Sequence, residues 1–191
     1  MLGPIALLCF ALGASPSSDP GTLVDRVIAV VGEEVVTESE LHVEARIALA
    51  YREGEEAATS PLASELLDSL RGYVINQLVI MIHARRLGAA DVSQERLTAV
   101  MDRFRSRFSS YVAYQAFLRR YGIGEETVRR ILRRDLRNEL FINKRLQRPG
   151  EKGTAKGANK KREEALALWL DQMKRSLNIR VLGANHRLES P

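Results

Sequence analysis

The sequence predicts a mainly α-helical domain with a small β element that joins the two ends of the chain. Apolar residues recur at helical spacing along most of the 191 residues, and each such stripe marks the buried face of an amphipathic helix. A short β-branched segment, Val24 to Val31, lies near the start, and a short alternating segment, Asn178 to Leu182, lies near the end. Gly32-Glu33-Glu34 can form a turn after which the chain returns at Val35-Val36, which predicts a small hairpin. Because a lone hairpin is marginal, we expect Asn178 to Leu182 to pair with Val27 to Val31 as a further strand.

The chain opens with a segment typical of a secretory signal. Met1 to Ala14 carries no charged side chain and contains an apolar run, and the stretch Ser15 to Gly21 that follows is rich in Ser, Pro and Gly. At about 1.5 Å per residue, this run is too short to cross a bilayer core of about 30 Å. We expect residues 1–20 to be a signal peptide and its exit, and the mature protein to be periplasmic without stable membrane insertion. The signal lacks its usual basic start, which leaves open a weak signal or an upstream start codon.

The first helix is predicted by a capping box. In Thr37-Glu38-Ser39-Glu40 the Thr37 hydroxyl can accept from the Glu40 amide while the Glu40 carboxylate reaches back. The helix is expected to run from about Thr37 to about Arg52, and the acidic stretch around Gly54 is expected to be a loop.

The second helix is expected to be the central buried one. Ser60-Pro61 has the pattern of an N-cap followed by proline at the first helical position, and Gly88 is expected to stop the helix. Val74 to Ile82 is apolar nearly all round, which is typical of a helix buried on every side.

Three further helices follow in the basic part of the chain. Ser93 is expected to cap one, Tyr111 to Tyr121 is expected to form the next, and Gly122-Ile123-Gly124 separates it from the third. The apolar stripe of the first comprises Leu97, Val100, Met101, Phe104 and Phe108. The predicted buried face of the third comprises Val128, Ile131, Leu132, Leu136, Leu140 and Phe141.

Residues 149–162 are rich in Gly and Lys and have no apolar period, which predicts a flexible linker. A last helix then follows, with Leu166, Trp169, Leu170, Met173 and Leu177 on one face. It leads into the strand around Arg180.

Val24 to Leu41 (VDRVIAVVGEEVVTESEL) closely resembles the opening of the SurA family of periplasmic chaperones. The resemblance continues more loosely to about Leu146. In that family one or two parvulin-type prolyl isomerase domains follow the helical module, and the chain then returns with a Trp-containing helix and a strand. Trp169 to Leu182 is similar to that return, whereas residues 149–162 are too few to form an isomerase domain.

The resemblance therefore implies a SurA N-terminal-like helical domain over residues 21–148. The linker 149–162 replaces the parvulin insertion, the helix and strand of residues 163–183 complete the same domain, and 184–191 form a tail. It implies an ATP-independent chaperone that holds unfolded outer-membrane or envelope polypeptides, with no isomerase activity.

The residues expected to contact unfolded polypeptide are aromatic. Tyrosine suits contacts of varied sequence because it combines an apolar ring with a polar hydroxyl. The predicted surface comprises Tyr111, Tyr114, Phe117 and Tyr121. Phe104, Phe108 and Phe141 are assigned to the core instead.

No catalytic, metal or cofactor site is predicted. Cys9 is the only cysteine and lies inside the predicted signal, so no thiolate site is expected in the mature chain. His42, His83 and His186 are far apart and have no paired-carboxylate or HxxxH pattern near them. Gly122-x-Gly124 lacks the third glycine of a dinucleotide loop.

The net charge of +5 is unevenly distributed, with acids dominating between Glu33 and Asp68 and bases between Arg103 and Arg148. A basic ridge comprises Arg129, Arg130, Arg133, Arg134 and Arg137, which we interpret as a solvated helix face. Three alternatives stay open at this stage. The chain could bind nucleic acid through this ridge, although no nucleic acid is expected; it could be a parvulin-type isomerase by family name only; or it could serve one dedicated envelope partner.

Overall fold

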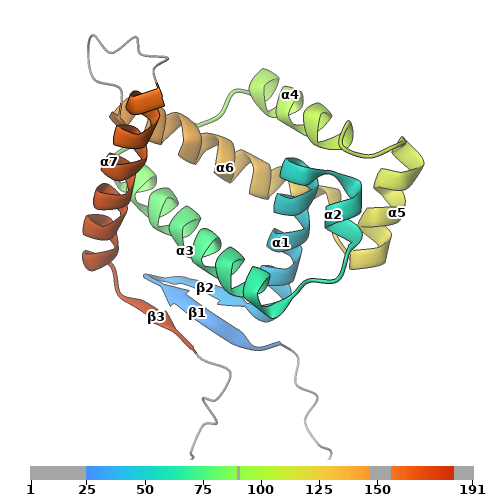
Figure 1. The fold of residues 1–191 in the computed structure, drawn as a ribbon, viewed down its shortest axis with the longest axis horizontal. Coiled ribbons are helices and arrows are strands. Elements are labelled where there is room, and N and C mark those ends of the chain that lie inside the picture. The colour runs from blue at the N-terminus through green and yellow to red at the C-terminus, as the bar shows by residue number, and fades with distance from the viewer. Residues whose placement is uncertain (1–24, 90, 147–155, 183–191) are drawn as a thin grey trace, which may run out of the picture.

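The computed structural model describes residues 25–89, 91–146 and 156–182 (Figure 1). The predicted mainly helical domain with a small β element is confirmed. The elements are β1 (Val27–Val31), β2 (Glu34–Thr37), α1 (Glu38–Glu53), α2 (Glu55–Thr59), α3 (Ser64–Arg86), α4 (Gln94–Arg105), α5 (Tyr111–Tyr121), α6 (Glu125–Leu146), α7 (Lys156–Arg175) and β3 (Ile179–Val181). The predicted signal peptide with Cys9, and the predicted tail with His186, lie outside the described residues.

The two distant strands pair as expected. The antiparallel sheet has the order β2-β1-β3, with Ala29 opposite Val181 and Val31 opposite Ile179. The Leu182 amide donates to the Ile28 carbonyl oxygen at 2.9 Å and continues the ladder. Helix α3 lies against one face of this sheet (Figure 1). The sheet therefore brings the start and the end of the described chain together beside α3.

The corner between β2 and α1 is built by the predicted capping box, which is present. The Glu40 amide donates to Thr37 Oγ1 at 3.3 Å, and the Thr37 amide donates to Glu40 Oε2 at 3.0 Å. Asp25 joins this corner, because the Ser39 hydroxyl donates to its Oδ2 and the Ser39 amide donates to its Oδ1 at 3.2 Å. Hydrogen bonds from the Ser39 side chain first, and then from Thr37, lower the pKa of Asp25 to about 2.

We expect Asp25 to titrate near pH 2 in the folded protein and near 3.9, the usual value for an aspartate, in the unfolded chain. Because the folded pKa is the lower one, the stabilisation is complete above about pH 4 and is lost as the pH falls towards 2. An NMR titration of the side-chain carboxyl carbons measures this pKa directly. Ser39→Ala should move it back up, and an unshifted wild-type value would contradict the predicted corner.

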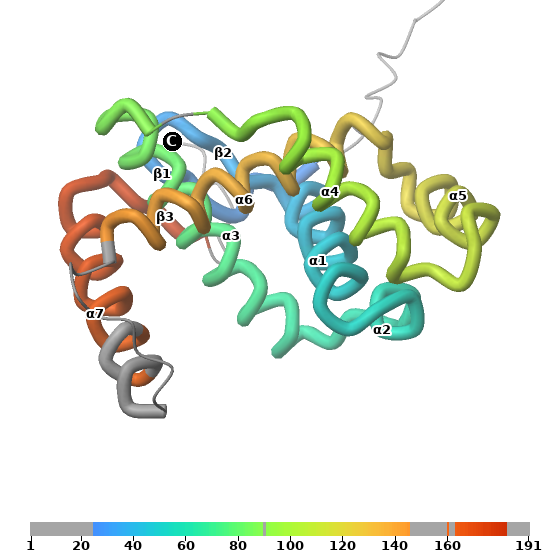
Figure 2. The backbone as a smooth tube through the Cα atoms, turned by 90° about the horizontal axis from the view of Figure 1, so that it is seen from above, coloured from blue at the N-terminus to red at the C-terminus, as the bar shows by residue number. Residues whose placement is uncertain are grey.

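Helix α1 separates two hydrophobic cores. The aromatic core is built around Phe104, Phe108, Tyr114 and Phe117 and also receives Ile47 of α1. The sheet core is built around Ile28, Ala29, Val31, Val74 and Leu78. Seen from above, α5 lies at one end of the molecule and α7 at the other, and α6 runs between them (Figure 2). The second half of α6 consequently extends beyond the aromatic core.

The segment between α1 and α3 differs from the prediction. The stretch after Gly54 is a short helix, α2, whose Ala58 is buried, and the Ser109 amide donates to Glu55 Oε2 at 2.8 Å. Ser60 ends α2 and does not cap α3, because residues 61–63 that follow it are not helical and its hydroxyl donates back to the Glu56 carbonyl oxygen at 2.9 Å. Helix α3 begins only at Ser64.

Two further boundaries are corrected. Helix α4 ends at Arg105, so Phe108 reaches the aromatic core from the turn that follows the helix. Helix α7 begins at Lys156, so residues 156–162 are helical and the predicted linker is shorter at its C-terminal side. The Lys, Arg and Ala residues of this stretch have high helix propensity and extend the amphipathic helix with a polar first part. The rest of the predicted linker, 149–155, lies outside the described residues.

Candidate functional site along helix α6

The apolar side chains of helix α6 are buried in the first half of the helix and only half-buried in the second half. Val128, Ile131 and Leu132 are buried in the aromatic core, as predicted. Leu136, Leu140 and Phe141, predicted to continue the buried face, are only half-buried and belong to neither core. This part of the prediction is wrong because the stripe passes beyond the aromatic core, and the neighbouring parts of α3, α4 and α7 cover these side chains only in part.

Two hollows lie along this second half of α6, and opposite sides of the helix line them. Asp135, Asn138, Glu139 and Ile142 follow one another at helical spacing and line the first hollow. The second is lined by a stripe that begins at Arg137. Since one helix turn holds about 3.6 residues, a shift of two positions turns a side chain to the other side.

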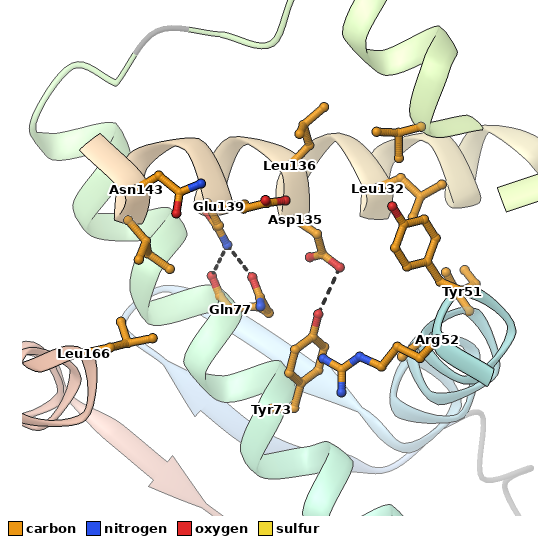
Figure 3. Close-up of a pocket in the computed structure, with 15 residues that line it drawn as sticks. Tyr51, Arg52, Tyr73, Gln77, Leu132, Asp135, Leu136, Glu139, Asn143 and Leu166 are labelled. Carbon is orange, nitrogen blue, oxygen red and sulfur yellow. Dashed lines mark hydrogen bonds between the residues drawn. The ribbon is translucent and has the colours of Figure 1, made fainter. Parts of the chain in front are cut away.

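The first hollow, which we call the central groove, has a volume of about 450 Å³ and lies between α1, α3 and α6, with Leu166 of α7 at one end (Figure 3). Its apolar wall includes Ile47, Ala48, Leu132, Leu136, Ile142 and Leu166. Its hydrogen-bonding groups include Tyr51, Arg52, Tyr73, Gln77, Asp135 and Glu139. The groove therefore combines apolar surface with donors and acceptors over most of its length.

A buried ion pair fixes α6 to α1, next to Asp135 of the central groove. Arg134 Nη1 and Nη2 donate to Glu44 Oε1 and Oε2 at 2.6 and 2.8 Å, and both side chains are almost fully buried. Arg134 Nε also donates to Asp135 Oδ1 at 2.9 Å. The other oxygen of Asp135 accepts from the Tyr73 hydroxyl of α3 at 3.2 Å (Figure 3). One network thus holds together the three helices that shape the groove.

Asn138 supplies a second link between α6 and α3. It is almost fully buried, and its Nδ2 donates to the Gln77 backbone carbonyl at 2.9 Å and to Gln77 Oε1 at 2.7 Å (Figure 3). These two bonds hold Asn138, which lines the groove, against α3.

The network keeps the Tyr73 hydroxyl protonated and the Arg134 guanidinium charged. Burial, and next the Asp135 carboxylate, raise the pKa of Tyr73, so its hydroxyl stays protonated. Arg52 lies over the Tyr73 ring, with its guanidinium carbon 4.7 Å from the centroid. Burial acts to lower the pKa of Arg134, but its bonds to Glu44 and the charge of Asp135 outweigh this and raise it, so Arg134 stays charged.

The second hollow, which we call the basic hollow, has a volume of about 680 Å³. It lies where the end of α3 and the start of α4 meet the last turns of α6. Its apolar floor comprises Leu87, Ala89, Leu140 and Phe141. Its charged groups are Asp91, Arg96, Arg137, Lys144 and Arg145. Of these charged groups, only Arg137 belongs to the basic ridge predicted to be a solvated helix face.

The aromatic residues predicted to contact polypeptide do not form one surface, and none of them lines either hollow. Tyr111 is 66% exposed, but Tyr114 and Phe117 are only 0% and 3% exposed and pack in the aromatic core, so the prediction is wrong for these two. Tyr121 is half-buried, because its hydroxyl donates to the Thr59 carbonyl at 3.2 Å and Arg46 lies over its ring.

The interpretation of the basic ridge as a solvated helix face is only partly correct. Arg130 is exposed, whereas Arg134 is buried in its pair with Glu44 and is not part of a solvated face.

His42 is exposed, and His83 is buried beside the Trp169 ring. Among the described residues, no group of three His, Cys, Asp or Glu side chains could hold a metal ion.

Comparison with known proteins assigns no family: no protein-family model matches the chain, and no curated protein matches it. No helix in the described part of the chain is long and apolar enough to span a membrane.

Proposed function

We propose that the protein is an ATP-independent chaperone that holds unfolded outer-membrane or envelope polypeptides in the periplasm. The central groove is the observation that supports this most. Its apolar side chains can shield apolar client residues from water, at about 25 cal/mol for each Å² removed. The resemblance of Val24 to Leu41 to the SurA opening supports the same assignment.

The dimensions of the groove favour brief binding of short segments. A volume of about 450 Å³ lies in the lower part of the range of ligand pockets, so the groove can take only a few client residues at once. An extended segment also needs partners for its backbone groups, and exposed Arg52 and Glu139 at the rim can provide them. Many weak contacts of this kind give the fast release that a holding chaperone needs.

The first experiment measures light scattering when a urea-unfolded outer-membrane β-barrel is diluted into buffer at physiological salt. We expect the wild-type protein to suppress scattering at near-stoichiometric amounts. Leu136→Asn places an amide in the apolar wall of the groove, and we expect it to require about tenfold more protein, which corresponds to about 1.4 kcal/mol of lost contact.

Leu168→Asn is the matched control, because Leu168 is 74% exposed on α7 and lies outside the groove. Thermal unfolding of both variants separates loss of binding from loss of fold, and Ile142→Asn repeats the test at a second position of the wall. Equal activity of the groove variants and the control would contradict the role of the groove. A wild-type protein that suppresses nothing would contradict the chaperone proposal, and suppression that vanishes at modest salt would favour a polyanion partner instead. Catalysed isomerisation of a proline peptide would contradict the absence of isomerase activity.

A further inference from the structure

The basic hollow lies on the side of α6 that faces away from the central groove. Arg137, Leu140, Phe141 and Lys144 follow one another at positions i, i+3, i+4 and i+7, so apolar and cationic side chains share a single stripe. Leu87, at the end of α3, completes the apolar floor and is 60% exposed. The hollow is thus an open depression with an apolar base and a cationic rim.

The four cations of the hollow have no partners among the described residues. Arg96, Arg137, Lys144 and Arg145 form no ion pair or side-chain hydrogen bond there. Other arginines of the protein are paired, including Arg85 with Glu34, Arg105 with Glu125 and Arg134 with Glu44. The one acid of the hollow, Asp91, has an oxygen that already accepts from the Val92 amide at 2.8 Å.

This arrangement costs stability in the free protein. Arg137 is half-buried and its Nε is fully buried without a hydrogen-bond partner, so its charge is partly desolvated and uncompensated. Arg96 lies in the first turn of α4, where the helix dipole disfavours a cation. Like charges gathered in one hollow also repel one another. A bound anion would relieve all three effects.

We propose that the basic hollow binds an anionic, apolar segment of a client polypeptide, in which a carboxylate side chain neighbours an aromatic or aliphatic one. The carboxylate would pair with the guanidinium groups at the rim, which match its geometry bidentately, and the apolar side chain would lie on Leu140 and Phe141. This inference rests on the proposed chaperone function and specifies one class of segment that the chaperone selects.

The shape of the hollow favours a polypeptide over a lipid as the occupant. Among the described residues, the apolar ones that line it are Leu87, Ala89, Leu140 and Phe141, and Leu87 is 60% exposed. One or two side chains can be covered by such a floor. A long acyl chain would leave most of its methylene groups in water, losing about 0.8 kcal/mol for each.

The test is fluorescence anisotropy with three labelled peptides that are identical except at alternating positions between phenylalanines, occupied by Asp, Asn or Lys. We expect the wild-type protein to bind the Asp peptide about tenfold more tightly than the Asn peptide, and the Lys peptide least. Arg96→Gln combined with Lys144→Gln should remove that preference while leaving binding of the Asn peptide unchanged. Both residues are exposed, so the fold is expected to persist.

Arg103→Gln combined with Arg107→Gln is the matched control, because it removes the same charge from exposed positions of α4 and its end, outside the hollow. Equal binding of the Asp and Asn peptides, or equal loss in the control, would overturn the inference. So would tighter, Arg96-dependent binding of phosphatidylglycerol vesicles or of a DNA oligonucleotide. A failed preference with intact suppression of scattering would leave the chaperone proposal standing, whereas a retained preference without suppression would remove the chaperone and keep an acidic-peptide site.

Discussion

Glu44→Gln is expected to lower the free energy of unfolding by about 3 kcal/mol. The substitution removes the negative charge of Glu44 and leaves the buried guanidinium of Arg134 charged, with Asp135 as its remaining anionic partner among the described residues. The bidentate bonds at 2.6 and 2.8 Å join α1 to α6, so the loss should appear in the global transition. Asp135 keeps its contact with the guanidinium, which places the expected loss at the low end for a broken buried pair. Urea unfolding followed by circular dichroism measures the change.

The control for this prediction is the exposed pair of Arg129 and Glu126, whose atoms are 3.5 Å apart at i,i+3 on the surface of α6. Glu126→Gln should cost less than about 1 kcal/mol. Replacing both buried partners, Glu44→Leu with Arg134→Met, should recover most of the stability lost in Glu44→Gln. A single substitution at Glu44 that costs no more than the one at Glu126 would show that the buried pair does not hold the helices together.

The elements of the fold were predictable where the signal is local. The capping box at Thr37 and the break at Gly122 each involve neighbouring residues, and both are present in the structure. The pairing of β1 with β3 was predictable for a different reason, since the first hairpin needed a further strand and the chain offers an alternating segment at its far end. The error at Ser60 arose because the same Ser-Pro pattern can end one helix as well as begin another.

The candidate site could not be predicted from the sequence, because its contacts are long-range. Glu44 and Arg134 are 90 positions apart, and nothing in the local pattern distinguishes Arg134 from the arginines beside it. Leu136, Leu140 and Phe141 extend the apolar spacing of α6 beyond Leu132, and only the positions of the neighbouring helices determine that these side chains are left half-buried. A stripe of apolar residues shows which side of a helix faces the protein interior. It does not show where along the helix the neighbouring helices stop covering that side.

The same limitation explains the misplaced aromatic residues. Tyr111 and Tyr114 are both tyrosines of α5, yet one is exposed and the other is fully buried. Three positions along a helix put them near the same face, so their different burial reflects how far Phe104 and Phe108 extend over α5. Residue type alone does not separate a contact surface from a core that happens to contain a tyrosine.

Phe104→Ala is expected to cost about 3–5 kcal/mol, because Phe104 is fully buried and its ring meets those of Phe108 and Tyr114 at centroid distances of 5.6 and 6.1 Å. The removed ring would leave a cavity that these neighbours can fill only by abandoning their edge-to-face contacts. Chemical denaturation gives the loss, and Tyr111→Ala, at an exposed aromatic position, should cost less than about 1 kcal/mol. Comparable losses for the two variants would contradict an aromatic core built around Phe104. A large loss for Phe104→Ala alone would support the assignment of Phe104, Phe108 and Tyr114 to one buried aromatic core.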